Sequence, residues 1–488
     1  MKRYIYITIL SLSVLFTDCT DDLTLEEISV DPNNPVNGTP ALLITSAQGS
    51  ILGRFGVDWD RYAGTFVQTF AGNHATGVRA DQYDLQNQDF TGSFTNMYQK
   101  GFRDLKEVIE VMGPNQEAWG HVGIAKIMTA TGLGFLTDIY GDLPWSEALD
   151  VANFTSPSYD SQEQLYDVIF TMLQESIVDL NKTSLITVGA EDVVFGGDLN
   201  KWKATANLLL ARYNNHLSKR DPSGSATKAL TYVDAAKAAG LNSNAGNYNM
   251  NYNAADTAFL NPWYLLFTNN LIIASENFVN LLLSTNDPRG LAYWDLFAFP
   301  VGSGGAIFPQ IVGKPNGNPT GSASYSPVGP NTYYGKQDSP VLIATYFELL
   351  FIEAEAAMRS GNATRAATAH NAAVAASMDM LRSTILVNGT PEADITAYLA
   401  TFANETATTI TMEKIMEEKY KAMFTMNLET WVDLRRHDFQ YPSYLSLPNN
   451  AKLSEFPRRG LYPQTELTTN EENVPSGQTM TSRLWWDN

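Results

Sequence analysis

The sequence predicts a mainly α-helical protein in which paired helices pack against an irregular, loop-rich face. Stretches with apolar residues at spacings of three and four, the period of a helix with one buried face, recur before residue 240 and after residue 341. Between about 241 and 340 the composition changes to Asn, Gly, Pro, Ser and aromatic residues, mostly without helical period. Short turns between the helical stretches favour tetratricopeptide-like pairs, although no strict 34-residue repeat is present.

The composition allows a large core and disfavours one class of partner. Of 488 residues, 44% are hydrophobic and 17% charged, which is ordinary for a globular protein. The net charge of −20 repels phosphate backbones, so we expect no nucleic-acid partner. The 23 Tyr, 23 Phe and 9 Trp serve mainly core packing, but Tyr and Trp also offer flat faces for sugar rings.

The N-terminus has the pattern of an export signal. Lys2 and Arg3 precede an apolar run over 4–16, which predicts a signal peptide at 1–18 and is too short for a comfortable membrane span. Cys19, the single cysteine, follows, so no internal disulfide can form. A cysteine here is typical of the acylated residue of a bacterial lipoprotein, with residues 19–35 as a lipidated tether. Asp18 is unusual before such a cysteine, and a signal cleaved or retained without acylation is the alternative.

Turn and stop signals divide the first half of the chain into helices. The periodicity predicts helices over 40–52, 58–70, 94–112, 118–140, 161–180, 200–218 and 226–239. Residues 74–88 are polar and follow a stop signal at 71–73, so we expect an exposed loop there. Asp142 and Glu147 lie just beyond a helix end. Paired carboxylates can perform acid/base chemistry, but capping of nearby backbone is the favoured interpretation.

The second half combines further helices with long irregular stretches. The periodicity predicts helices over 275–283, 341–360 and 364–381. Residues 302–340 are rich in Gly, Pro and Ser, and such a long irregular stretch in a folded domain is usually functional. Residues 443–488 are expected to be largely irregular. Trp485 and Trp486 are expected to pack in the core.

Residues 411–436 carry the most informative pattern. Apolar side chains from Met412 to Trp431 recur at spacings of three and four, which predicts an amphipathic helix with a wide apolar stripe. Beyond it, opposite charges surround a large indole in Glu429, Trp431, Asp433, Arg435 and Arg436. A solvated helix end and a paired polar network beneath the core both give such a cluster, and the need to bury Trp431 and Leu434 favours the network.

Several motifs resemble, in the expected order, those of the SusD/RagB family of bacterial outer-membrane lipoproteins. They are Tyr140 to Ala148 (YGDLPWSEA), the helix from Trp202 to Arg212, Ser275 to Arg289, the hairpin from Tyr346 to Asn362, Glu418 to Ala422, Glu429 to Arg436, and Tyr462 to Asn470. One fragment would be weak evidence, but together the motifs extend the resemblance over nearly the whole chain.

The resemblance implies a single SusD-like domain over 36–488, with four degenerate tetratricopeptide-like pairs and a loop-rich insertion at about 241–340. It implies an outer-membrane protein held by its lipid anchor and facing the cell exterior. The implied function is capture of an oligosaccharide or polysaccharide and its delivery to a SusC-like TonB-dependent transporter. Two alternatives stay open: a peptide-binding lid of a RagB-like importer, and a structural lid without ligand recognition of its own.

The ligand residues implied by the resemblance lie on loops after the early helices and within the central irregular region. By position they are Asn73, Arg79, Asp81, Tyr83, Trp263, Tyr264, Trp294, Tyr325, Tyr333 and Tyr334. Glycan binding predicts aromatic platforms beside amide and carboxylate groups on one exposed face. Peptide binding predicts a longer groove with backbone-pairing groups and no platform the size of a sugar ring.

The sequence offers no constellation typical of catalysis. None of its five histidines pairs with another His or a Glu at zinc-ligand spacing, and it contains no phosphate-binding loop. We therefore expect no enzyme activity, no catalytic residue, no metal site and no cofactor. The sequence leaves a structural calcium ion open.

Overall fold

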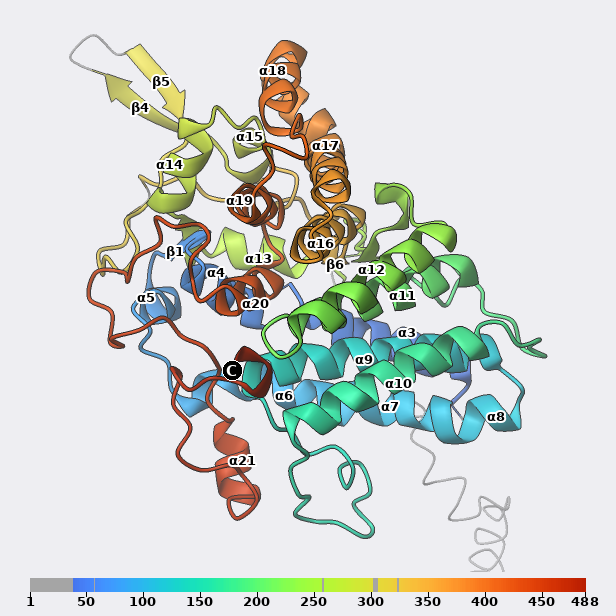
Figure 1. Ribbon diagram of the computed structural model, residues 1–488. Helices are drawn as coiled ribbons and strands as arrows, with labels where there is room; N and C mark the ends of the chain where they lie inside the picture. Colours follow the sequence, from blue (N-terminus) through green and yellow to red (C-terminus); the bar gives the residue numbers. More distant parts are fainter. Residues whose placement is uncertain (1–37, 57, 257–258, 302–305, 323) are drawn as a thin grey trace, which may run out of the picture.

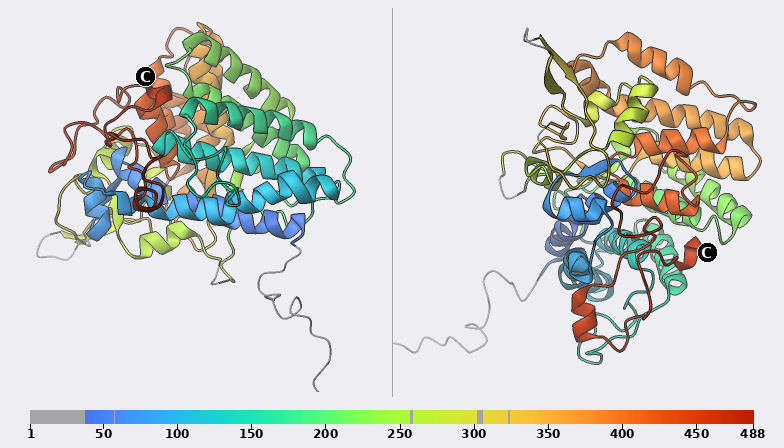
Figure 2. Two further views of the ribbon diagram at one scale, coloured as in Figure 1. Left: turned by 90° about the horizontal axis from the view of Figure 1, so that it is seen from below. Right: turned by 90° about the vertical axis from the view of Figure 1, so that its left-hand side faces the viewer.

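The computed structural model describes residues 38–56, 58–256, 259–301, 306–322 and 324–488. The expected signal peptide, tether and acylated Cys19 lie outside these residues. The described chain is mainly helical, as predicted. Helical pairs gather on one side, and the loop-rich central region with its short strands lies on the other (Figures 1 and 2).

Four successive helical pairs form the scaffold. Their helices are α3 (Pro40–Ile51), α6 (Thr91–Asn96), α7 (Arg103–Glu107), α8 (Gly113–Asn115), α9 (Trp119–Tyr140), α10 (Gln162–Asp179), α11 (Leu199–His216), α12 (Pro222–Ala238), α16 (Tyr346–Arg359) and α17 (Ala363–Val387). Helix α3 packs on the stretch from α6 to α8, α9 on α10, α11 on α12, and α16 on α17. Because α10 also contacts α11 and α12 contacts α16, the last three pairs stack in chain order.

Helix α9 is the central helix of the scaffold. It is long and apolar enough to cross a membrane, but 94% of its apolar window is buried inside the protein, so it is a core helix. A Cβ atom added at Gly134 would lie 2.1 Å from the hydroxyl of Tyr213. The glycine therefore allows α11 to approach α9 closely.

The two carboxylates after α9 cap backbone N–H groups, as predicted. The helix ends at Gly141, which has a φ of +85°. An Asp142 carboxylate oxygen accepts a hydrogen bond of 2.8 Å from the Gln162 backbone N–H, at the start of α10. Glu147 accepts one of 2.7 Å from the Ser158 backbone N–H. Both side chains thus fix the loop between α9 and α10.

Residues 411–436 form two helices, α19 (Met412–Ala422) and α20 (Asn427–Arg436). The helix is interrupted between them, where Thr425 adopts a φ of +69°. Within this cluster Asp433, Arg435 and Arg436 are buried around Trp431, and the Glu429 side chain is 13% exposed, which confirms the predicted polar network. Arg436 donates to both carboxylate oxygens of Glu355 on α16, at 2.6 and 2.9 Å. The ammonium of Lys419 lies 2.7 Å from Asp433, so α19, α20 and α16 are joined by paired charges.

A buried arginine ties the C-terminus to the scaffold. The Arg435 guanidinium lies 3.7 Å from the ring centre of Trp431 and 4.8 Å from that of Trp486. It donates hydrogen bonds of 2.8 Å to the carbonyl oxygens of Asp138 and Arg458. Trp486 is fully buried, so its predicted packing role is confirmed.

The region predicted to be irregular contains short elements that lack a sequence period. Its antiparallel strand pairs are β1 (Phe70–Gly72) with β3 (Ile272–Ala274), β2 (Tyr248–Met250) with β6 (Val341–Ala344), and β4 (Phe297–Val301) with β5 (Ala306–Gln310). Phe70 lies opposite Ala274, and Phe297 opposite Gln310. Its helices are α13 (Pro262–Thr268), α14 (Glu276–Ser284) and α15 (Gly290–Tyr293), of which the sequence predicted α14.

Other elements also differ from the sequence predictions. The stretch predicted as one helix over 341–360 begins as strand β6, and helix α16 starts at Tyr346. Helix α4 (Asp58–Phe66) ends before strand β1 instead of reaching residue 70. Helix α5 (Ala75–Asp81) lies within the stretch predicted to be an exposed loop. Helices α18 (Glu392–Phe402) and α21 (Gln464–Thr469) were not predicted. Helix α18 forms one wall of the groove described below.

Candidate ligand-binding face

The two loop regions that the sequence assigned to ligand binding meet in space. The Asn73 backbone N–H donates to the Leu271 carbonyl oxygen at 2.8 Å, and its side-chain oxygen accepts from the Ser322 N–H at 3.0 Å. The Asp81 carboxylate accepts from the Asn316 side-chain amide and the Gly317 N–H, both at 2.7 Å. Residues 72–83, 264–274, 313–322 and 324–325 therefore form one surface, which we call the loop face.

A buried lysine fastens the loop face from within. Lys314 is fully buried, and its ammonium donates to the carbonyl oxygens of Gly72 and, at 2.7 Å, of Asn318. Burial lowers the pKa of Lys314, which nearby Asp81 partly offsets. Burial raises the pKa of Asp81 to about 6, against the hydrogen bonds that favour its charged form. These charges hold the loops together and do not face a ligand.

Two glycines allow α5 to lie close against the β1–β3 pair. A Cβ atom at Gly72 would lie 2.0 Å from the Gly77 carbonyl oxygen, and one at Gly77 would lie 2.1 Å from the Leu271 carbonyl oxygen. Real Cβ atoms do not approach backbone oxygens so closely. Any larger residue here would push α5 away from the strands.

Six of the ten sequence-predicted ligand residues are buried, contrary to the expectation of an exposed site. They are Asn73, Asp81, Tyr83, Trp263, Trp294 and Tyr334. The aromatic ones pack on other rings: Trp263 on Phe267, with ring centres 5.2 Å apart, and both Trp294 and Tyr334 on Phe424. A side chain that solvent does not reach offers no platform to a sugar ring, so the structure gives these residues packing and loop-fastening roles.

The other four predicted residues are partly exposed but are not gathered in one platform. Arg79 is engaged with the Asp89 carboxylate through two hydrogen bonds, of 2.8 and 3.2 Å. Tyr264 accepts a hydrogen bond of 3.1 Å from the Gln337 side chain. Tyr325 belongs to the loop face, whereas Tyr333 is linked to α15 by a backbone hydrogen bond to Ala292. Their ligand contacts stay a prediction.

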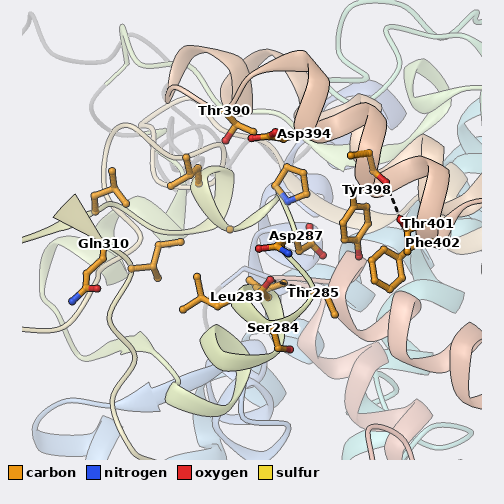
Figure 3. Close-up of a pocket in the computed structure, with 18 residues that line it drawn as sticks. Leu283, Ser284, Thr285, Asp287, Gln310, Thr390, Asp394, Tyr398, Thr401 and Phe402 are labelled. Atoms are coloured by element: carbon orange, nitrogen blue, oxygen red, sulfur yellow. Dashed lines mark hydrogen bonds between the residues drawn. The ribbon is translucent and has the colours of Figure 1, made fainter. Parts of the chain in front are cut away.

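A groove of about 840 Å³ lies between α14 and α15 on one side and α18 on the other (Figure 3). Helix α14 connects it to the loop face, because Ser275 pairs with Lys314 at one end and Ser284 lines the groove at the other. None of the ten predicted residues lines it. Its lining residues are Leu282, Leu283, Ser284, Thr285, Asn286, Asp287, Pro288, Gly290, Leu291, Leu296, Gln310, Ile311, Thr390, Asp394, Ala397, Tyr398, Thr401 and Phe402.

One wall of the groove is a single face of α18. Asp394, Ala397, Tyr398 and Thr401 follow one another at spacings of three, one and three, so they share one side of the helix. The sequence carries a signal for this helix at its start. Pro391 precedes a first turn with Glu392 and Asp394, which is a typical helix start.

The floor of the groove rests on a buried network of charges. The Tyr398 hydroxyl accepts a hydrogen bond from Arg289 at 2.8 Å and donates one to Glu418 at 2.8 Å. Arg289 also binds the Asp287 carboxylate, and Lys421 is paired with Glu418. Burial lowers the pKa of Arg289, whereas the nearby Asp287, Tyr398 and Glu418 groups raise it. The net effect is a raised pKa. Tyr398 is therefore held in one orientation below the groove.

The chemistry of the groove suits a ligand that is both apolar and rich in hydroxyls. Leu283 and Leu296 are 55% and 43% exposed, so the groove presents apolar surface to solvent. Thr285, Thr390 and Gln310 add hydrogen-bonding groups beside it, as Figure 3 shows. Apolar surface with a few converging polar groups is the general pattern of a small-ligand site. As the structure describes it, the lining contains no His, Cys, Lys or Arg.

A second hollow of about 800 Å³ lies between α6, residues 144–157 and α21. Phe94, Tyr98 and Phe154 are among its lining residues, and Val151, also in the lining, is 81% exposed. It shares no lining residue with the loop face or the groove. Because the groove is joined to the loop face, we take the groove as the candidate site.

One cluster among the described residues has the spacing of a metal site. Ligand atoms of Asp138, His216 and Glu429 lie within 4.8 Å of one another. Both ring nitrogens of His216 are already engaged, Nδ1 at 3.2 Å from Asp138 and Nε2 at 3.0 Å from Glu429. Burial lowers the pKa of His216, but the two carboxylates more than offset it and raise the pKa to about 9. The cluster is therefore an ion triad with a charged imidazole.

Comparisons with known proteins agree with this scaffold. A family model named SusD-like and described as starch-binding, associating with the outer membrane, matches residues 32–463. A SusD/RagB family protein from Bacteroides thetaiotaomicron is similar in structure, with 23% identity, a TM-score of 0.75, and coverage of 92% of this chain and 99% of that one. No curated protein matches the sequence.

Two similar structures carry a ligand in their names. One is a chitin-binding protein with 25% identity and a TM-score of 0.76, covering 92% of this chain and 100% of its own. The other is a chitin-binding SusD homolog from Flavobacterium johnsoniae with 19% identity and a TM-score of 0.73, covering 91% of this chain and 98% of its own. The latter likeness shows the fold alone.

Proposed function

The chain belongs to the SusD-like family, a starch-binding family that associates with the outer membrane, and from this premise we propose that it is a cell-surface lipoprotein that binds a glycan and delivers it to a SusC-like, TonB-dependent transporter. In this proposal Cys19 carries the acyl chains that hold the protein in the outer membrane, facing the exterior. Its action is binding and release, without covalent chemistry on the ligand.

The observation that carries the glycan proposal is the groove beside the loop face. Its exposed leucines supply apolar contact for the faces of sugar rings, and its threonines and amides supply partners for hydroxyl groups. The structural neighbour named as a chitin-binding protein, with 25% identity, supports the same ligand class. The half-exposed Tyr264, Tyr325 and Tyr333 are proposed to contact parts of a longer glycan outside the groove.

The glycan proposal is tested by native electrophoresis of the full lipoprotein through gels that each contain one polysaccharide: starch, soluble chitin derivatives, xylan, mannan and others. We expect at least one polysaccharide to slow the protein relative to a gel without it. Retention by none, combined with binding of oligopeptides in solution, would support the peptide-importer alternative. Binding of neither class would support a structural lid.

The anchor and the partner are tested separately from the ligand. The variant Cys19→Ala is expected to leave the outer-membrane fraction, and the unaltered protein to incorporate labelled palmitate. Gentle detergent extraction of the unaltered protein is expected to co-purify a TonB-dependent barrel. A Cys19→Ala protein that stays in the outer membrane would contradict the anchor, and recovery of the protein without any barrel would contradict the partner.

A further inference from the structure

We infer that the groove selects neutral or amine-bearing sugars and rejects carboxylated or sulfated ones. This inference rests on the proposed glycan-binding function and adds a substrate class to it. It is carried by the charges around the groove. The cations beneath the groove are all paired with carboxylates, whereas one carboxylate on its wall has no partner.

The cations beneath the groove are not available to an anionic ligand. Arg289 is fully buried, and all three guanidinium nitrogens are engaged: Nε and Nη2 by Asp287, Nη1 by Ser377, and Nη2 also by Tyr398 and Glu418. Lys421 is also fully buried and is paired with Glu418. Glu417 also lies 3.6 Å from the Lys421 ammonium, so the floor contains no unpaired cation.

Asp394 is the charged group that faces the groove from its wall. It lies on the groove side of α18, next to Thr390 in Figure 3, and its residue is exposed. Within the described part of the chain its carboxylate has no hydrogen bond or ion pair. It is therefore free to accept hydrogen bonds from sugar hydroxyls or to pair with an ammonium group.

The N-terminus of α18 does not provide a binding site for anions. A helix N-terminus attracts negative charge through its unpaired N–H groups. Here the first turn already contains Glu392 and Asp394. Glu392 is paired with Arg382, which leaves the Asp394 charge to dominate the rim. A carboxylate or sulfate entering the groove would meet this charge without a cation to offset it.

The local charge can be measured without knowing the ligand. In a full chain with Cys19→Ser, a thiol is introduced by Ala397→Cys, three residues from Asp394 on the same helix face. The thiol is then reacted with two methanethiosulfonate reagents, one carrying a trimethylammonium cation and the other a sulfonate anion, and the two reaction rates are compared. The matched control is Ala400→Cys, an exposed position on α18 outside the groove lining. The ratio of the two rates cancels any change in thiol reactivity itself.

We expect the cation-to-anion rate ratio to be higher at Ala397→Cys than at Ala400→Cys. For charges about 6 Å apart in screened water the excess is about three- to tenfold. Adding Asp394→Asn should remove it, whereas Asp167→Asn, the same change at an exposed position of α10, should not. Equal ratios at the two positions, or an excess that survives Asp394→Asn, would overturn the inference.

Titration calorimetry then tests selection among sugars, with three β-1,4-linked hexamers: cellohexaose, glucosamine hexamer and glucuronic acid hexamer. We expect the uronate to bind at least threefold more weakly than the better of the other two, and Asp394→Asn to narrow that gap. Equal or tighter uronate binding would overturn the inference. If no hexamer binds while the rate ratio is as expected, the proposed function fails for these glycans and the charge assignment stands.

Discussion

The buried ion triad gives a prediction with a definite sign and size. His216 lies between Asp138 and Glu429, and its pKa in the folded protein is about 9 instead of 6.5. The protonated ring is therefore favoured by folding. The resulting stability is fully present below pH 6.5 and is lost as the pH rises through 9. A difference of 2.5 pKa units corresponds to about 3 kcal/mol.

The perturbation is His216→Gln, which keeps a polar side chain but removes the titrating cation. At pH 6 the variant lacks the cation between Asp138 and Glu429, although Glu429 keeps Arg212 at 3.3 Å. From the raised pKa of His216 we expect a loss of about 3 kcal/mol in the free energy of unfolding. Between pH 6.5 and 9 the wild-type protein should lose about 3 kcal/mol that the variant does not. The difference in unfolding free energy between the wild-type protein and the variant should therefore become smaller as the pH rises.

This difference in unfolding free energy is measured by urea unfolding, followed by tryptophan fluorescence, at pH 6, 7, 8 and 9. The control is His74→Gln, the same substitution at an exposed histidine outside the triad. A gap between wild type and His216→Gln that stays constant from pH 6 to 9 would refute the assignment of a charged imidazole in the triad.

Three further predictions concern the loop face and the core. Gly72→Ala forces a methyl group against the Gly77 carbonyl and should lower the unfolding free energy by about 1–3 kcal/mol in urea titrations; an unchanged midpoint would mean that α5 is not packed there as described. Lys314→Met removes the ammonium that fastens the loops, costs about 2 kcal/mol, and should increase proteolysis within 313–325; unchanged cleavage would contradict its role. Trp431→Ala should cost about 3–5 kcal/mol in urea unfolding, and a loss below 1 kcal/mol would contradict its place in the core.

The scaffold could be predicted from the sequence because each of its helices has a local apolar periodicity. A buried face every three or four residues is local information, so α9, α11 and α16 were found without knowing their partners. The polar network around Trp431 was predictable for a related reason. A large indole that must be buried among four charges requires those charges to be paired.

The meeting of the two loop regions agrees with the sequence prediction, whereas ligand binding there stays a prediction. The sequence located the two loop regions, and the structure brings them together. The sequence did not indicate which side chains point outward. Their orientation depends on contacts between distant residues, such as Lys314 and Gly72, which are 242 positions apart. The aromatic residues chosen as platforms were needed for packing around Phe424 instead. The groove was missed because its wall, α18, was not predicted.

The account depends most on glycan binding in the groove, and a pair of variants tests this directly. Ala397→Arg fills the groove with a long side chain, whereas Ala400→Arg adds the same residue to an exposed position of α18 outside it. Dissociation constants are measured by calorimetry for the polysaccharide that retains the wild-type protein in gels. We predict that Ala397→Arg weakens binding more than tenfold and that Ala400→Arg binds like wild type. Equal affinity of all three proteins would show that the glycan is bound elsewhere.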